Sequence, residues 1–383
     1  MIRTCCAACG TPLAHTAPRC GDCHTRYCGR ECQKQHWKDG GHNKDICKKI
    51  KRGGGAEKYH ADTKCAEAVA VAVEKCADDT KGQTCYICTE ALHWKTKEGL
   101  VRGCACRGTA GFAHVSCLAE QAKILVAEAE ENNLDDNRFM PRWRRWDTCS
   151  LCEQDYHGVV ACALGWACWK TYLGRSEADW VRRLTFSVFG NALHAAEHYE
   201  DALPVQEAEL SMLRRLGASE ANILDVHCNL AMTYAKLGRI EEASRMLQGA
   251  YSGQLKLNGG ENADTLAAAN NYATSLIRLK RFEEAKALLR KMIPVARRVL
   301  GECNQTTLMT RWNYAGAICN DTAATLDDLR DAVTTLEETE QTARRVLGGA
   351  NPLVGEIETS LREARAALSA GDMNSISDAV GAL

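Results

Sequence analysis

The chain has 383 residues, of which 45% are apolar and 25% are charged, a composition typical of globular proteins and long enough for two or three domains. The 48 basic and 49 acidic residues leave a net charge of −1, which excludes attraction to nucleic acid or anionic membranes through overall charge. No secretion signal opens the sequence, and the longest apolar stretch, VVACALGWACW, is too short for a bilayer, so we expect no membrane span.

Most of the 22 cysteines lie in the first half of the chain. Seventeen of them precede Glu153, mainly as close pairs, and only five follow it. Without a secretion signal or a membrane span, we expect an intracellular protein, cytoplasmic or nuclear, where thiols stay reduced and such pairs are more typical of metal sites than of disulfides. The sequence therefore predicts a metal-binding first half and a second half without metal sites.

The first group of paired cysteines spans residues 6–47. Its candidate ligands are Cys6, Cys9, Cys20, Cys23, Cys28, Cys32, His42 and Cys47. Eight thiol and imidazole ligands suffice for two structural zinc sites, because such sites are tetrahedral and closed. Cys5 could replace Cys6, although Cys6 gives the commoner spacing, and His36 could replace His42.

The motifs CAAC, CGDC, YCGREC and CQKQHW make this segment resemble the MYND-type zinc finger. The resemblance implies that the pairs interleave. One zinc ion would be held by Cys6, Cys9, Cys28 and Cys32, and the other by Cys20, Cys23, His42 and Cys47. We expect this finger over residues 1–52.

An alanine-rich stretch without proline follows three consecutive glycines, 53–55. Its composition predicts a helix that ends near residue 82. We expect residues 53–82 to form a helical linker that acts as a spacer. Cys65 and Cys76 stand alone in it, so we expect them to pack the helix and not to bind metal.

The second group of paired cysteines spans residues 85–152. Its candidate ligands are Cys85, Cys88, Cys104, Cys106, His114, Cys117, Cys149 and Cys152. The motifs CYIC, CACRGT, FAHVSCL and WDTCSLC resemble the RING-CH (RINGv) finger of ubiquitin ligases. The resemblance implies one zinc ion on Cys85, Cys88, His114 and Cys117 and another on Cys104, Cys106, Cys149 and Cys152. The chain would then bind four Zn²⁺ ions, two per finger.

We expect this second finger over residues 83–157, with an insertion between Cys117 and Cys149. The Ala, Glu and Leu content of LAEQAKILVAEAEENNLDDN predicts that the insertion is helical.

The resemblance implies a finger that binds a ubiquitin-conjugating enzyme and makes no bonds itself, so we expect no catalytic residue. By family position Ile87 would contact that enzyme, with Trp143 and Trp146 as further candidates. Glu153 follows the last ligand, where active fingers often have a basic residue, and Gln121 stands where a tryptophan is frequent. The sequence therefore leaves two hypotheses, a soluble ubiquitin ligase or a non-catalytic, zinc-stabilised interaction scaffold.

The second half repeats with a fixed period. NLAMTYAKLGRIEEA, NYATSLIRLKRFEEA and NYAGAICNDTAATL begin at Asn229, Asn271 and Asn313, in steps of 42. This pattern resembles the longer tetratricopeptide repeats of kinesin light chains, which implies an α-solenoid of helix pairs over residues 158–383 with a C-terminal capping helix. The implied core positions are Leu230, Ala231, Tyr234, Gly238, Ala243, Tyr272, Ala273, Phe282 and Ala285.

The sequence thus predicts a mainly α fold, with two small zinc-stabilised cross-brace fingers joined by a helix and followed by the solenoid. Such a solenoid offers a groove for protein or peptide clients, and the MYND-type finger is a second client site. The candidate groove residues are Asn229, Asn271, Asn313, Arg278 and Arg311. No spacing matches a helix that reads a DNA groove, so we expect no nucleic acid partner.

Overall fold

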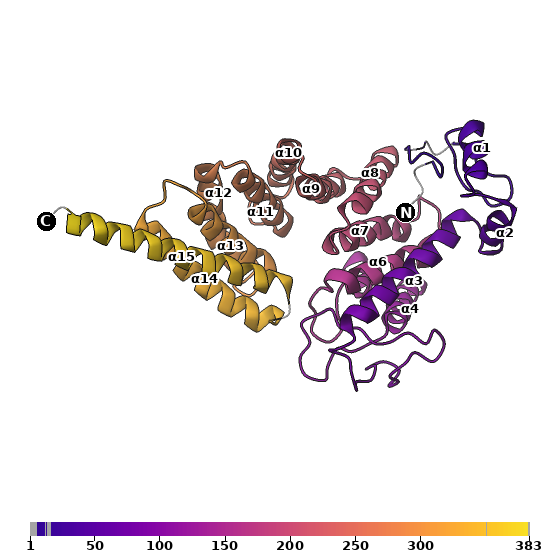
Figure 1. The fold of residues 1–383 in the computed structure, drawn as a ribbon, viewed down its shortest axis with the longest axis horizontal. Coiled ribbons are helices and arrows are strands. Elements are labelled where there is room, and N and C mark those ends of the chain that lie inside the picture. The colour runs from indigo at the N-terminus through magenta and orange to yellow at the C-terminus, as the bar shows by residue number, and fades with distance from the viewer. Residues whose placement is uncertain (1–5, 12, 14–16, 350, 382–383) are drawn as a thin grey trace. The chain divides into compact units, whose positions relative to one another are not determined.

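The structure of the chain is a computed structural model that describes residues 6–11, 13, 17–349 and 351–381, and of residues 371–381 only the backbone. Contacts divide the chain into two compact units, Met1–Leu216 and Gly217–Leu383. Helices dominate both units (Figure 1), and the described residues form no β-strand beyond three isolated β-bridges. The mainly α fold class is therefore confirmed.

The first unit combines irregular, cysteine-rich segments with helices. Its helices are α1 (Arg30–Lys38), α2 (Lys44–Arg52), α3 (Ala56–Cys76), α4 (Val115–Glu131), α5 (Asp136–Trp143), the short 3-10 helix η1 (Arg144–Trp146), α6 (Gly158–Tyr172), α7 (Trp180–Ala195) and α8 (Tyr199–Arg215). Helices α4 and α5 confirm the predicted helical insertion. The boundary predicted at residue 158 stays a prediction, because α6, α7 and α8 belong to the first unit by their contacts.

Helix α3 packs along α6 and is not a spacer. Its alanine-rich sequence gives it a flat apolar face, on which Ala61, Cys65, Ala72 and Cys76 are buried. The packing role expected for the two cysteines is confirmed, whereas the spacer interpretation is wrong. The helix also ends at Cys76, earlier than predicted, because the segment after it turns into the second finger.

Helix α6 is the most completely buried helix of the first unit. It carries the longest apolar stretch of the sequence, most of its residues are buried, and it packs against α3, α4 and α7. Within the described part of the chain, no helix is long and apolar enough to cross a membrane.

The second unit is a succession of helix pairs. Its helices are α9 (Glu220–Lys236), α10 (Ile240–Asn258), α11 (Ala263–Arg278), α12 (Phe282–Val299), α13 (Gln305–Cys319), α14 (Leu326–Leu347) and α15 (Pro352–Gly381). Each helix packs against the next one in the sequence, as Figure 1 shows. Helix α15 packs on α14 and α13, as expected of a capping helix.

A polar side chain caps the first helix of each repeat. Ser219, Asn262 and Asn304 accept hydrogen bonds from backbone amides in the first turns of α9, α11 and α13, respectively. Such a cap is worth about 1 kcal/mol, because it satisfies an amide that has no partner inside the helix. The recurrence of these residues explains why the linking segments repeat along with the helices.

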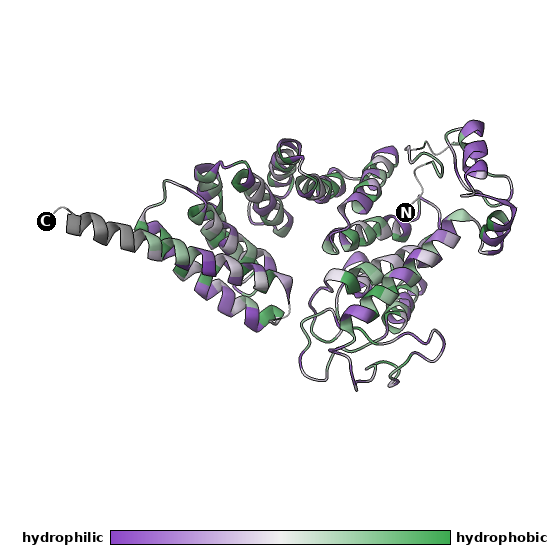
Figure 2. Ribbon diagram, viewed as in Figure 1, coloured by the Kyte–Doolittle hydropathy of each residue, from purple (hydrophilic) through white to green (hydrophobic). Residues whose placement is uncertain are grey.

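The repeat positions predicted for the core are buried, with two exceptions. Gly238 is exposed and has a φ of +85°, which suits the turn between α9 and α10 and not a packing contact. Phe282 begins α12 and is only partly buried. Figure 2 shows hydrophilic and hydrophobic residues following one another along α14, where a buried stripe includes Ala332, Leu336 and Ala343.

Two of the predicted groove residues, Asn313 and Arg311, are buried and bond to neighbouring helices. The Asn313 side chain is buried and donates to Asn270 Oδ1 and Thr274 Oγ1, both at 3.0 Å. Arg311 is buried as well, and its guanidinium lies 2.6 Å from a Glu338 carboxylate oxygen. These two side chains therefore join neighbouring helices, whereas Arg278 is exposed.

The reactivity of two cysteines, Cys228 and Cys303, tests the burial described for the second unit. Burial raises the pKa of Cys228 in α9 to about 12, and nearby Asp225 adds to the shift, whereas Cys303 is exposed. We expect iodoacetamide at pH 8 to alkylate Cys303 at least about a hundredfold faster than Cys228, because only the thiolate reacts. Peptide mass spectrometry measures both rates. Equal rates in the native chain would contradict the described packing of α9, and denaturant should abolish the difference.

Candidate metal centres

The first finger is built from two tight turns and two short helices. Cys6 and Cys9 lie in one turn, closed by a hydrogen bond from the Gly10 amide to the Cys6 carbonyl. Cys20 and Cys23 lie in a second turn of the same form, closed by the His24 amide. Each turn directs both thiols of its pair to one side.

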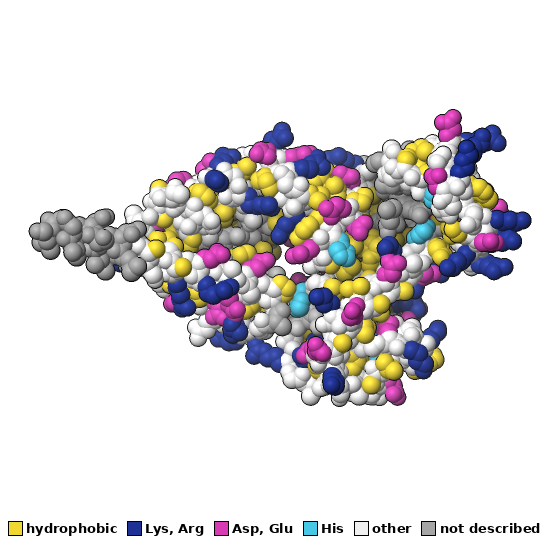
Figure 3. Space-filling model, viewed as in Figure 1, with side chains coloured by type: hydrophobic (Ala, Val, Ile, Leu, Met, Phe, Trp, Pro, Cys, Tyr) yellow, Lys and Arg dark blue, Asp and Glu magenta, His cyan; other side chains and the backbone are white. Residues whose placement is uncertain are grey.

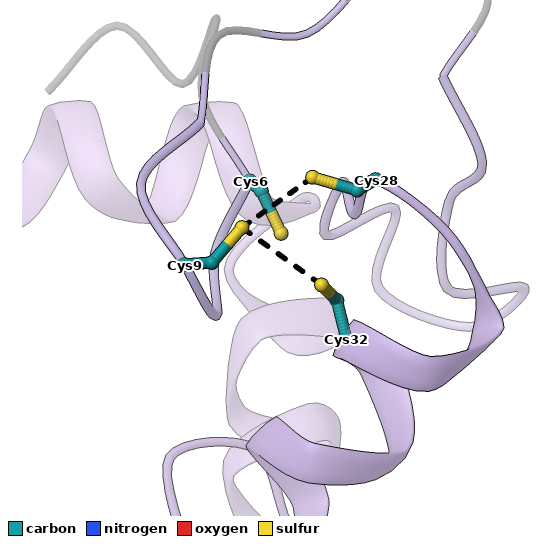
Figure 4. Close-up of side chains that lie close together, drawn as sticks. All are labelled: Cys6, Cys9, Cys28 and Cys32. Atoms are coloured by element: carbon teal, nitrogen blue, oxygen red, sulfur yellow. Dashed lines mark hydrogen bonds between the residues drawn. The ribbon is translucent and has the colours of Figure 1, made fainter.

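The first cluster joins Cys6 and Cys9 to Cys28 and Cys32, which lie just before and within α1 (Figure 4). The Sγ atom of Cys9 is 3.4 Å from that of Cys28 and 3.8 Å from that of Cys32. Cys9 and Cys28 are exposed, so one side of this all-thiol cluster faces solvent.

The second cluster joins Cys20 and Cys23 to His42 and Cys47, and all four residues are buried. The Sγ atoms of Cys20 and Cys47 are 3.8 Å apart, and His42 Nε2 is 3.2 Å from Cys23 Sγ. Asn43 caps α2 through its side chain and thereby fixes the helix that carries Cys47.

The second finger has the same interleaved plan. Its third cluster is Cys85, Cys88, His114 and Cys117, and its fourth is Cys104, Cys106, Cys149 and Cys152. His114 Nδ1 lies 3.3 Å from Cys88 Sγ and 3.6 Å from Cys117 Sγ. An antiparallel bridge between Val101 and Ala113 holds the segments of the two clusters together.

The distances within the clusters fit a tetrahedral ion. Ligands about 2.3 Å from zinc at tetrahedral angles lie roughly 3.8 Å apart for two sulfurs, and slightly closer for sulfur and nitrogen. The thiol pairs lie 3.4–3.8 Å apart and the thiol–imidazole pairs 3.2–3.6 Å, close to these separations, and all ligand atoms of a cluster lie within 4.8 Å of one another. A disulfide needs about 2.05 Å, and the described cysteines are free thiols. The chemistry and geometry of the four clusters therefore support zinc binding.

The thiols of one cluster cannot all ionise without a cation. A hydrogen bond with Cys104 lowers the pKa of Cys149 to about 4, while the pKa of Cys104 rises for the same reason. In the first cluster the Thr11 hydroxyl lowers the pKa of Cys9 to about 6, and the bond with Cys9 raises that of Cys32 to about 12. Thiolates at such distances repel each other, and a divalent cation between them compensates this repulsion.

Helix α1 has little apart from the clusters to hold it. None of its residues is buried, and Cys32 is its contribution to the first cluster. Tyr27 and His42 contact it from the side of the second cluster, through His36 and Trp37. The position of α1 therefore depends on the metal-binding residues around it.

The structure separates the three predicted enzyme-contact residues. Ile87 lies in the turn between Cys85 and Cys88 and is 37% exposed. Trp143 and Trp146 are 3% and 1% exposed and pack against Tyr172 of α6, so they belong to the core and offer no surface to a partner. Each tryptophan directly follows an arginine, so the local sequence pattern does not predict this burial.

Leu151 is not among the contact residues predicted from the sequence, although it lies between Cys149 and Cys152 as Ile87 lies between Cys85 and Cys88. Leu151 is 51% exposed. The Tyr86 hydroxyl lies 3.1 Å from Ser150 Oγ and so holds the two cysteine turns side by side. The signal in the sequence was an apolar residue inside the last cysteine pair.

Two residues, His36 and Cys5, were considered as alternative ligands of the first finger. His36 belongs to none of the four clusters, and its Nδ1 atom lies 3.2 Å from the Tyr27 hydroxyl. Cys5 lies outside the described residues.

Comparisons with known proteins agree with these features. Residues 6–47 match the family model of the MYND finger, residues 85–152 the RING-variant domain, and residues 222–298 the tetratricopeptide repeat. No curated protein gives a significant match to the sequence.

Two solved structures show a distant likeness to the chain, and the first of them is described as having tetratricopeptide-like repeats. A putative kinesin light chain of Podospora anserina is 15% identical, with 61% of this chain and 97% of that chain covered and a TM-score of 0.38. BtubC of P. vanneervenii is 12% identical, with coverages of 69% and 90% and a TM-score of 0.37. By the three family models, the chain contains, in order, a MYND finger, a RING-variant domain and tetratricopeptide repeats, a combination that supports a zinc-binding protein-interaction protein.

Proposed function

We propose that the chain binds four Zn²⁺ ions, two per finger, and acts as a RING-variant ubiquitin ligase. The RING-variant domain recruits a ubiquitin-conjugating enzyme, while the MYND finger and the repeats bind protein clients. The ions neutralise the charge of the thiolates and so stabilise the two fingers. Their ligands are the sixteen clustered residues named above. The finger contributes no nucleophile, because its role is to bind and orient the conjugating enzyme.

The exposed pair Ile87 and Leu151 is the observation that carries the ligase proposal. Both side chains stand on cysteine turns, and the bond between Tyr86 and Ser150 keeps these turns adjacent. Large apolar residues on a small rigid surface are typical of protein contacts, since they gain free energy only when a partner covers them. The turns themselves are fixed by the clusters, so the pair is presented in one arrangement.

The MYND finger presents a different surface to clients. Basic side chains cover α1 and α2 (Figure 3), among them exposed Lys34, Lys38, Lys44 and Lys48. Trp37 is exposed on α1 within this basic surface. We expect client segments that combine acidic residues with an apolar residue, because charge complementarity favours such segments.

The alternative is a zinc-stabilised scaffold without a role in ubiquitin transfer. It is favoured by Glu153, which directly follows the last ligand: its side chain is 79% exposed, and its carboxylate lies 4.0 Å from the Arg145 guanidinium. An acidic group here repels any acidic group of ubiquitin that approaches the same place.

Self-ubiquitination with a panel of conjugating enzymes tests the ligase proposal. We expect Ile87→Ala and Leu151→Ala each to reduce transfer about tenfold or more with zinc content unchanged, since each variant removes an apolar contact and no ligand. Leu92→Ala is the matched control, because Leu92 is exposed on another loop of the same finger and transfer should persist. Cys104→Ser should lose both zinc and transfer.

Glu153→Arg separates the two hypotheses. It should raise transfer if the acidic residue limits the ligase, because a guanidinium can bridge the enzyme and its ubiquitin. If the wild-type chain and Glu153→Arg are both folded and zinc-loaded yet inert with every conjugating enzyme, the ligase proposal fails and the scaffold stands.

A further inference from the structure

A chain of buried hydrogen bonds extends from the second cluster into the MYND finger. His42 Nε2 faces Cys23 Sγ inside the cluster at 3.2 Å, while its Nδ1 atom lies 2.8 Å from the Tyr27 hydroxyl. The same hydroxyl lies 3.2 Å from Nδ1 of His36. Tyr27 and His42 are 1% and 0% exposed, so bulk water does not compete for these contacts.

The order of donors in this chain follows from the ring nitrogen that faces the cluster. An imidazole that binds an ion through Nε2 must carry its proton on Nδ1. With an ion on Nε2, His42 would donate that proton to the Tyr27 oxygen, and the Tyr27 hydroxyl would donate its own hydrogen to His36 Nδ1. The opposite tautomer of His42 would place an N–H group against the thiolates and exclude the ion.

The backbone around His36 keeps the last acceptor in place. A Cβ atom built on Gly41 would lie 2.2 Å from His36 Nε2, so the chain passes against the imidazole at a point where only glycine fits. The His42 amide also donates to the His36 carbonyl at 3.1 Å. His36 and His42 are thereby held in a fixed relation on both sides of Tyr27.

We propose that Tyr27 and His36 are positioning residues that select the zinc-binding tautomer of His42. The affinity of the second cluster for zinc then depends on a phenol hydroxyl and an imidazole that are not ligands. This inference rests on the proposed zinc binding and adds residues to it. Partners of this kind typically contribute ten- to a hundredfold to metal affinity, because they fix the ring and make its free nitrogen more basic.

The other clusters provide internal references. The first cluster has four thiols and no tautomer to select. In the third cluster His114 turns Nδ1 to the thiols, and its Nε2 atom lies 3.4 Å from the backbone carbonyl of Ala91. Loss of the Tyr27 hydroxyl should therefore weaken zinc binding at the second cluster alone.

Tyr27→Phe in the full-length, zinc-loaded chain tests the proposal. Titration with a chromophoric chelator should show one of the four ions bound about ten- to a hundredfold more weakly, with the other three unchanged. The long-range ¹H–¹⁵N spectrum of the histidines should show His42 with its proton on Nδ1 in the wild type and a mixture of tautomers in the variant. Tyr59→Phe is the matched control, since its ring lies at the edge of the same core, and its affinities should equal those of the wild type.

Substitutions at His36 give an independent readout should Tyr27→Phe fail to fold. His36→Phe removes the acceptor and should weaken the same site, whereas His36→Gln keeps an acceptor and should restore part of the affinity. Equal affinity for the two His36 variants, or an unchanged His42 tautomer and affinity in a folded Tyr27→Phe chain, overturns the proposal. A wild-type chain that holds no zinc at the second cluster would instead overturn the proposed metal binding.

Discussion

Removal of zinc should unfold both fingers and leave the repeats of the second unit folded. The core of the MYND finger is small, and four of its buried residues, Cys6, Cys20, Cys23 and Cys47, are proposed ligands. The apparent free energy of zinc binding, about 10–16 kcal/mol per structural site, is then folding free energy that this core cannot replace. The cores of the second unit contain no ligand cluster among the described residues.

Hydrogen exchange of the full chain in a strong chelator measures this result. Amides of residues 17–52 and 85–157 should exchange at nearly unfolded rates, while amides of α9 to α14 keep their protection. Readdition of zinc serves as the control, because protection should return with four equivalents of the ion. Protection that persists in α1 after all metal has left would show that the MYND finger folds without zinc.

Leu336→Ala should destabilise the second unit by about 2–5 kcal/mol without changing zinc content. Leu336 is fully buried in α14 and packs within a core that includes Leu308 of α13 and Ile357 of α15. Its truncation leaves a cavity between three helices, which rigid neighbours cannot fill.

Urea unfolding followed by the helical signal measures the loss. Leu255→Ala, at a residue 41% exposed in the same unit, is the control and should cost less than about 1 kcal/mol. If the two variants lose equal stability, the described burial of α14 is wrong.

The spacing of residues along the chain predicted the features that form within short segments, namely the metal-binding turns and the repeated helix pairs. Pairs such as Cys85 and Cys88 lie in one turn, so their local spacing indicates their chemistry, and a repeat of 42 residues indicates stacked helix pairs because each unit repeats the same contacts. Contacts between distant segments could not be read in this way. The bond from Tyr27 to His36 and the contact of Trp146 with Tyr172 depend on how turns and helices meet in space.

Arg311 illustrates the same limit within the repeats. Its charge and its place in the pattern suggested a groove, but the side chain is buried and pairs with Glu338, a residue of the next helix outside the aligned motif. Helix α3 was misjudged for a related reason, since an alanine-rich sequence gives high helix propensity whether or not a neighbour covers the helix.

Helix α1 buries none of its residues, so the client surface proposed for the MYND finger depends on the supply of zinc. On our proposals, a chain made during zinc shortage would complete its repeats but leave Lys34, Trp37 and Lys38 on an unfolded segment. Newly synthesised molecules would then accumulate in a form that binds clients through the repeats alone. The fraction of molecules able to bind through both surfaces would follow the free zinc concentration at the time of synthesis, with no change in the amount of protein.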